Sequence, residues 1–210
     1  MKICGLTRTE DIDAVNESHP DFAGFVFAPR SRRYITREWA SVLRARLNGC
    51  IGVVGVFYDA GLDEIADLVK DGIIDMVQLH GNEDAAYVKS LRELLSGTAC
   101  APIIKAVSAD FLHSHIPSGG CCSHDCIPSG GFGGPDYFLI DNGGGGTGRA
   151  FDWGILHGLH RDDKLYLDLG CAPFFLAGGI DEDNIAEALA VAPYAVDVSS
   201  GAETNGVKDA

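Results

Sequence analysis

Small residues follow two apolar segments near the C-terminal end, and their backbone groups could bind phosphate. The segments and the residues after them are Phe174–Ala177 with Gly178 and Gly179, and Ala195–Val198 with Ser199, Ser200 and Gly201. If both segments are strands, the N–H groups at their ends and at the start of a helix opening at Asp181 can hold a dianion. Bulky side chains there would exclude the dianion, so the pattern predicts a phosphate-binding site at two neighbouring strand ends.

Eight apolar segments must position this site, and they alternate with segments of helical periodicity. We expect strands at Lys2–Cys4, Ala23–Phe27, Ile51–Phe57, Met76–Leu79, Ile103–Val107, Tyr137–Ile140, Phe174–Ala177 and Ala195–Val198. Strands that are apolar on both faces and separated by helices indicate a parallel sheet. Eight such units in 210 residues predict an α/β fold, a single (β/α)₈ barrel domain over residues 1–210 in which phosphate binds after strands seven and eight.

The helical segments have plausible start signals. They are Thr9–Ser18, Arg37–Leu47, Leu62–Lys70, Asp84–Leu95, Trp153–Leu159 and Glu182–Val191. Thr36 and Asp181 are residue types that favour the N-cap position. An open, doubly wound sheet is the alternative architecture, but no G-x-G-x-x-G sequence follows the first strand.

Two of the strand–helix units look incomplete. Residues 108–135 contain Ile116–Gly120 and Ile127–Gly131, two copies of Ile-Pro-Ser-Gly-Gly, which cannot form a long regular helix. The chain also ends at Ala210, too soon after the eighth strand for a closing helix, so we expect either a truncated sequence or a barrel without its last outer helix. The first of these segments carries the zinc-ligand types His113, His115, Cys121, Cys122, His124 and Cys126. Their spacing matches no standard zinc finger, and we expect no metal there.

Charge and composition exclude several classes of partner. The formal net charge of −14 disfavours nucleic acid and anionic membranes, both of which require a basic face. No apolar run approaches the roughly 18 residues of a membrane span, and we expect no signal peptide before the first strand. The seven cysteines are scattered, which favours reduced thiols and a cytoplasmic location. An anionic ligand would need a local positive site that overcomes the overall negative charge.

Nine segments along the chain carry a family resemblance. They are Lys2–Thr7, Gly24–Ile35, Val54–Asp59, Val77–Glu83, Ile103–Val107, Asp136–Asn142, Gly145–Trp153, Phe174–Ile180 and Val196–Asp209. In this order they resemble the phosphoribosylanthranilate isomerases of tryptophan biosynthesis. The resemblance implies a TIM barrel that converts a small phosphorylated substrate by an Amadori rearrangement, an aldose–ketose isomerisation. It also implies no cofactor, and a monomer or homodimer that acts alone or within a longer tryptophan-pathway polypeptide.

The Amadori reaction needs an acid that opens the furanose ring and a base that removes the proton from sugar C2. The resemblance implies that Cys4 is the base and Asp141 the acid, each at the end of a predicted strand. It also implies that Arg33 binds the substrate carboxylate through its guanidinium, with Arg32 as the substitute if the register slips by one. Without the resemblance, Cys4 would fit a buried core cysteine and Asp141 an ordinary turn residue.

Further residues are expected to line the pocket. Gly146 lies in Gly145–Gly148, which resembles a mobile loop that closes over the substrate, although a plain flexible linker would have the same composition. Gln78 and His80 follow the fourth strand, and we interpret His80 as a pocket wall rather than as the acid or base. Asp197 points either to the pocket mouth or into the barrel core.

Three other functions compete with this interpretation. A related histidine-pathway isomerase would carry aspartate at the position of Cys4. Indole-glycerol-phosphate synthase would use lysines at strand ends, and here Lys105 alone lies in a suitable strand. A catalytically inactive, phosphate-binding barrel is the third alternative, and the presence of all the expected catalytic residue types argues against it.

Overall fold

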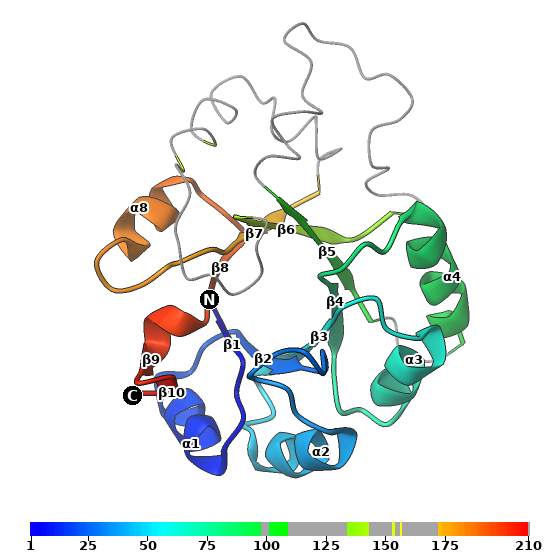
Figure 1. Ribbon diagram of the computed structural model, residues 1–210, viewed down its shortest axis with the longest axis horizontal. Helices are drawn as coiled ribbons and strands as arrows, with labels where there is room; N and C mark the ends of the chain where they lie inside the picture. Colours follow the sequence, from blue (N-terminus) through cyan, green and yellow to red (C-terminus); the bar gives the residue numbers. More distant parts are fainter. Residues whose placement is uncertain (98–100, 109–133, 143–152, 154–155, 157–171, 210) are drawn as a thin grey trace, which may run out of the picture.

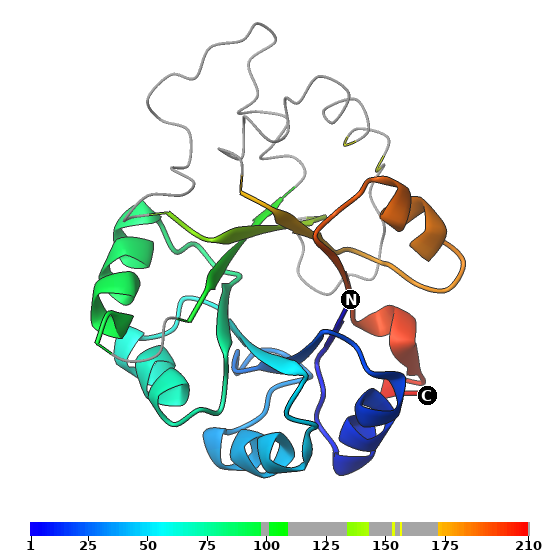
Figure 2. The same ribbon diagram turned by 180° about the vertical axis from the view of Figure 1, so that it is seen from behind.

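The fold is a closed barrel of eight parallel strands in the order β1 to β8 (Figure 1). The computed structural model describes residues 1–97, 101–108, 134–142, 153, 156 and 172–209. Helices surround the strands on the outside, and the view from behind shows the same ring (Figure 2). The predicted (β/α)₈ barrel is therefore confirmed.

The observed strands agree with the predicted ones to within one residue at each end. They are β1 Lys2–Cys4, β2 Phe22–Val26, β3 Gly52–Phe57, β4 Met76–Leu79, β5 Ile103–Ser108, β6 Tyr137–Asp141, β7 Phe174–Leu176 and β8 Ala195–Val198. After β8 come a 3₁₀ turn, η1 Ser200–Ala202, and a short antiparallel hairpin, β9 Glu203–Thr204 with β10 Val207–Lys208. The sequence did not predict this hairpin, because strands of two residues are too short to show an alternating pattern.

The described helices are α1 Thr9–Ser18, α2 Arg37–Arg46, α3 Leu62–Lys70, α4 Ala85–Leu95 and α8 Ile185–Ala190. Thr36 caps α2 as predicted, since its side chain accepts a hydrogen bond from Trp39 N. The predicted helix Glu182–Val191 is present as α8, but its predicted start was wrong, because the helix begins at Ile185 and Asp181 is not its N-cap. Two side-chain hydrogen bonds hold residues 181–184 in a turn before the helix. Asn184 Oδ1 accepts from Asp181 N at 3.0 Å, and Asp181 Oδ1 accepts from Asp183 N at 3.1 Å. The expected helix at Trp153–Leu159 and the segment 108–135 lie largely outside the described residues.

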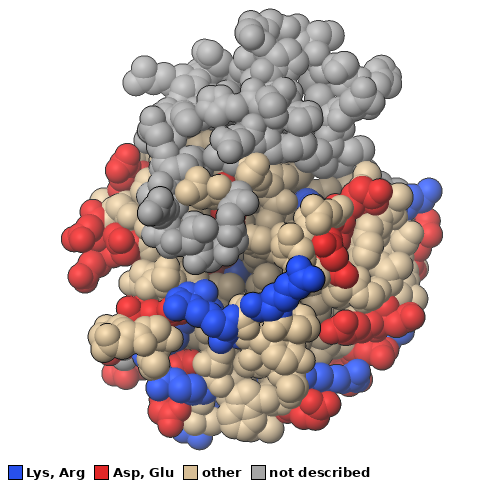
Figure 3. Space-filling model, in the orientation of Figure 1, with Lys and Arg blue, Asp and Glu red and all other residues tan. Residues whose placement is uncertain are grey.

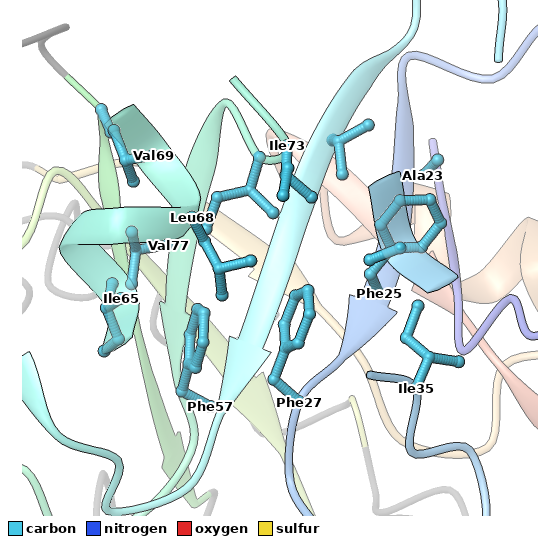
Figure 4. Packing of buried hydrophobic residues seen from close by; sticks show 14 of the residues in the cluster. Ala23, Phe25, Phe27, Ile35, Phe57, Ile65, Leu68, Val69, Ile73 and Val77 are labelled. Atoms are coloured by element: carbon cyan, nitrogen blue, oxygen red, sulfur yellow. The ribbon is translucent and has the colours of Figure 1, made fainter. Parts of the chain in front are cut away.

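Apolar side chains on the outer face of the sheet pack against the helices. Figure 4 shows this cluster beside β2, β3 and β4, where Phe27 and Phe57 stack with ring centroids 5.3 Å apart. Ile65, Leu68 and Val69 of α3 cover the same region, and all three are at most 4% exposed. Burial of each such side chain contributes about 1.5–3 kcal/mol, so this layer holds the strands in register.

The inner face of the sheet carries a second layer, which fills the barrel. Its members are Val54, Met76, Ile104, Leu139, Phe175, Ala177 and Ala195. At the amino ends of the strands, the rings of Phe22, Tyr137 and Tyr194 pack beside Phe175, with the Tyr137 and Tyr194 centroids 4.9 Å apart. Burial, helped by the hydrogen bond to Tyr194, raises the pKa of Tyr137 to about 12. The barrel is thus filled with side chains, and chemistry is left to the carboxyl ends of the strands.

In the described part of the chain, no helix combines the length and the apolar character that crossing a bilayer would require.

Candidate active site

Cys4 ends β1 and points into the barrel, where it packs against Val26 and Val56. Gly24 is its register partner on β2, and a Cβ at Gly24 would lie 2.7 Å from Cys4 Sγ. The missing side chain at Gly24 therefore makes room for the thiol. Burial raises the pKa of the Cys4 thiol, and the nearby Lys2 ammonium opposes that rise. The thiol is consequently protonated in the resting protein at neutral pH.

Asp141 ends β6, is 8% exposed, and lies in a hydrogen-bonded chain with two residues from β4 and the loop after it. His80 Nε2 lies 3.1 Å from Asp141 Oδ2, and Gln78 Nε2 lies 3.0 Å from His80 Nδ1. With the Gln78 amide nitrogen donating to Nδ1, the ring carries its proton on Nε2 and donates it to Asp141. Sequence reasoning placed His80 in the pocket wall; the structure also joins it to the proposed acid.

Asp197 lies in the barrel interior, which decides between the two positions that the sequence left open. Its Oδ2 accepts a hydrogen bond from Lys2 Nζ at 2.8 Å, and β1 and β8 pair in register at these two residues. Lys2 has no exposed surface, and Asp197 is 8% exposed. Sequence reasoning missed Lys2, although a lysine on the same strand face as Cys4, two residues earlier, was a usable signal.

Arg33 crosses over the end of β1 beside the proposed base. Gly5, which follows Cys4, has a φ of +83°, and a Cβ there would lie 2.1 Å from Arg33 Cδ. Arg33 Nε donates to Glu203 Oε1 at 2.7 Å, and its Nη2 donates to Glu203 Oε2 at 3.1 Å. A guanidinium has five N–H donors, and among the described residues this fork occupies two of them, so three can serve a ligand.

Glu203 joins three cations at the rim of the barrel, which we call the rim cluster: Arg32, Arg33, Glu203 and Lys208. Besides Arg33, it accepts from Arg32 Nη2 at 2.8 Å and from Lys208 Nζ at 3.0 Å. Burial would raise the pKa of the Glu203 carboxyl, but hydrogen bonds from Arg33 and Lys208 outweigh it and lower that pKa. Sequence reasoning missed Glu203, because Arg32 and Arg33 lie about 170 residues away in the chain.

A cavity of about 320 Å³ opens beside this cluster. Its walls are Gly5, Thr7, Arg8, Asp11, Arg32, Arg33, Glu203, Asn205, Gly206, Val207 and Lys208. Four of these residues are cationic and two are anionic, so the walls carry a surplus of two positive charges. Figure 3 shows Lys and Arg side chains along the lower margin of the hollow in the middle of this face. The cavity walls thus carry a local surplus of positive charge in a chain whose formal net charge is −14.

The five residues of the predicted phosphate site lie in the loops after β7 and β8, which are adjacent strands. Among the described residues, none accepts a hydrogen bond from the backbone N–H of Gly178 or Gly179. The loops nearly touch, since a Cβ at Gly201 would lie 1.9 Å from Ile180 O. The Ser199 hydroxyl does not face outward but donates to Cys4 O at 3.1 Å, tying β8 to β1. Ser200 begins the 3₁₀ turn that follows.

Some expected features lie outside the described residues: Gly146 with its loop 145–148, and the His/Cys-rich segment 113–126. Within residues that the structure does describe, no group of three His, Cys, Asp or Glu side chains is arranged to hold a metal ion.

Lys105, which the synthase alternative would need at the site, is engaged elsewhere. Its Nζ donates to Glu83 Oε2 and to Gly81 O, both at 2.7 Å. Both acceptors belong to the loop that follows β4. This lysine therefore supports that loop.

The chain is similar to known proteins over almost its whole length. The family described as "N-(5'phosphoribosyl)anthranilate (PRA) isomerase" matches residues 1–111 and 132–210. The N-(5'-phosphoribosyl)anthranilate isomerase of Endomicrobium trichonymphae is 41% identical, over 100% of this chain and 92% of the relative.

Two solved structures of phosphoribosyl anthranilate isomerase are also similar, and each alignment covers 99% of this chain and 91% of the other. One holds reduced 1-(o-carboxyphenylamino)-1-deoxyribulose 5-phosphate, with a TM-score of 0.71 and 30% identity. The other is a monomer generated from the dimeric enzyme of Thermotoga maritima, with a TM-score of 0.70 and 30% identity.

Proposed function

We propose a mechanism on the premise that the chain belongs to the N-(5'-phosphoribosyl)anthranilate isomerase family. The protein is an isomerase of tryptophan biosynthesis. It converts N-(5-phosphoribosyl)anthranilate into 1-(2-carboxyphenylamino)-1-deoxyribulose 5-phosphate, the third step from chorismate. The substrate carries a phosphate, a sugar and an anthranilate carboxylate, and the protein needs a binding group for each of them at the carboxyl ends of the strands.

The observation that carries the proposal is the order of groups around the barrel. Asp141 ends β6, the glycine- and serine-rich loops follow β7 and β8, Cys4 ends β1, and Arg33 follows β2. These five strands are consecutive, so a single substrate can reach all of these groups. Phosphate at Gly178, Gly179, Ser200 and Gly201, with the ring carboxylate at Arg33, would place the sugar between the acid and the base.

Proton transfers then complete the reaction. Asp141 gives a proton to the furanose ring oxygen, and the ring opens to a Schiff base. The Cys4 thiolate removes the proton from C2, which leaves an enolamine, and tautomerisation of the enolamine gives the ketone. A general acid or base of this kind contributes on the order of 10²–10⁴ to the rate. Gln78 and His80 hold the Asp141 carboxyl in place, and Ser199 holds the end of β1.

We also propose a cytoplasmic location and action as a monomer or homodimer, alone or within a longer tryptophan-pathway polypeptide. Cys4 and Cys50 are free thiols, which suits a reducing compartment. The similar Thermotoga maritima enzyme is dimeric, which supports self-association as one of the two states. Sedimentation of the purified chain would separate monomer from dimer.

A fluorescence assay with phosphoribosylanthranilate tests the function directly. We expect conversion by this chain, and no conversion of the corresponding histidine-pathway aminoaldose at a comparable rate. An inactive phosphate-binding barrel would bind the substrate but leave it unchanged, and that result would contradict the proposal.

A further inference from the structure

A fully buried lysine lies directly below the proposed base. Lys2 and Cys4 are two residues apart on β1, so both side chains point into the barrel, about 7 Å apart along the strand. Lys2 Nζ donates to Asp197 Oδ2 at 2.8 Å, and the two side chains are 0% and 8% exposed. The other carboxylate oxygen, Asp197 Oδ1, is buried with no hydrogen-bond partner among the described residues. We call Lys2 and Asp197 the floor pair.

Stability does not explain why the barrel interior holds the floor pair. Removing two charges from water costs several kcal/mol per ion, and the attraction between them often fails to repay that cost. Apolar side chains of similar volume usually fill a barrel interior equally well, as Met76 and Leu139 do here. A buried pair with one oxygen unsatisfied therefore points to a use of its charge.

The charged groups that face Cys4 come from three elements. Lys2 faces it from β1, Asp197 from β8, and Lys208 from β10. Burial raises the pKa of the Cys4 thiol, Lys2 opposes this more strongly than Asp197 reinforces it, and Lys208 opposes it as well. Lys208 already donates to Glu203 and to Ser199 O, whereas the Lys2 ammonium donates to Asp197 and has two further N–H donors to offer.

We propose that Lys2 is a positioning residue for the proton transfer, whose ammonium stabilises the Cys4 thiolate from inside the barrel while Asp197 holds it there. This inference rests on the proposed role of Cys4 as the base. With the floor pair in place, the Cys4 thiol stays protonated in the resting protein, and its ionisation requires only a moderate free energy. The substrate's phosphate dianion cannot stabilise a thiolate, because both are negatively charged. Lys2 therefore supplies the positive charge that the Cys4 thiolate needs.

Two variants that differ only in the lysine test this inference. Asp197→Asn frees the ammonium from its carboxylate, so the Cys4 thiolate should form at lower pH than in the parent protein. Lys2→Met/Asp197→Asn removes the ammonium as well, so the thiolate should form at higher pH than in the single variant. We expect the two titration midpoints to lie about one pH unit or more apart, which is a roughly tenfold change in thiolate fraction below the midpoint.

The readout is the ultraviolet absorbance of the thiolate as a function of pH, taken as the difference from the same variant with Cys4→Ser. This difference isolates Cys4 from the other cysteines and does not depend on access to a reagent. A purely structural role of Lys2 would leave the two midpoints equal, and equal midpoints would overturn the inference. If the double variant does not fold, an unchanged or higher midpoint in Asp197→Asn alone overturns it.

Activity separates this inference from the proposed function. In both variants kcat should rise and fall with the fraction of Cys4 that is ionised, and KM should change little. If Cys4→Ala keeps full turnover, the base role fails, whatever the midpoints show. If Cys4→Ala is inactive and the midpoints coincide, only the role of Lys2 fails.

Discussion

The floor pair and the rim cluster both place cations next to the candidate active site, but they balance charge differently. On the floor, one ammonium meets one carboxylate in the dry interior, and a thiol that can ionise lies above them. At the rim, a single carboxylate, Glu203, serves Arg32, Arg33 and Lys208. The floor is therefore neutral until Cys4 ionises, whereas the rim keeps a surplus of positive charge. The difference fits the roles proposed above, proton transfer beside the floor pair and anion binding at the rim.

Loss of the proposed acid, Asp141, should have the largest effect on the rate of the reaction. Asp141→Asn should lower kcat on the order of 10²–10⁴, with little change in KM, because the group transfers a proton and does not mainly bind. His80→Asn is the matched control, since it removes the ring that holds Asp141 but keeps the carboxyl. Steady-state kinetics should show a much smaller loss for His80→Asn. An equal loss would mean that His80 takes part in the proton transfer itself.

Filling the phosphate site should weaken binding and leave the chemistry less affected. In Gly201→Ala the new Cβ would meet Ile180 O, so the loops after β7 and β8 must move apart. A hydrogen bond to a charged group contributes about 1.5–3 kcal/mol, so we expect KM to rise roughly ten- to hundredfold. Gly49→Ala is the control, because a Cβ at Gly49 meets nothing within 4 Å. Equal KM values in the two variants would place the phosphate elsewhere.

Neutralising Glu203 should cost stability in a pH-dependent way. The pKa of Glu203 is lowered by Arg33 and Lys208, so its contribution is present above the unfolded pKa and is lost as pH falls through the folded pKa. Glu203→Gln should therefore unfold at lower urea than the parent at pH 7, by about 1–3 kcal/mol of unfolding free energy. The difference should shrink below about pH 4. A difference that is constant with pH would show that the carboxylate charge is not what stabilises the rim.

Removal of divalent metal ions by a chelator should have the smallest effect on activity. Each step of the proposed reaction is a proton transfer by this chain's own side chains, so exhaustive dialysis against a chelator should leave kcat unchanged. Zinc content of untagged protein, measured in parallel, reports on the His/Cys-rich segment 113–126. Activity that disappears and returns with a divalent ion would contradict the mechanism.

The sequence predicted the barrel and the residues at the strand ends because both depend on local patterns. Alternating apolar segments located the strands to within one residue, and a side chain at the end of a parallel strand must lie at the active-site face. For this reason Cys4, Asp141 and the loops after β7 and β8 could be assigned to one face from the sequence alone.

Pairs between distant parts of the chain could not be predicted in this way. Lys2 meets Asp197, and Arg33 meets Glu203, only after the barrel closes and brings β8 and the hairpin against β1. The start of α8 was misplaced for a different reason: Asp181 and Asn184 are both capping types, and side-chain bonds within the turn decided between them.

The kinetics of Cys4→Ala and Arg33→Ala, measured together with phosphoribosylanthranilate, test the division of labour most directly. We predict that Cys4→Ala loses kcat on the order of 10²–10⁴ with nearly unchanged KM, whereas Arg33→Ala mainly raises KM. In the double variant the loss in kcat and the rise in KM should combine, because Cys4 and Arg33 act on different parts of the substrate. A Cys4→Ala variant with near-normal turnover, or an Arg33→Ala variant that loses kcat at an unchanged KM, would contradict the account.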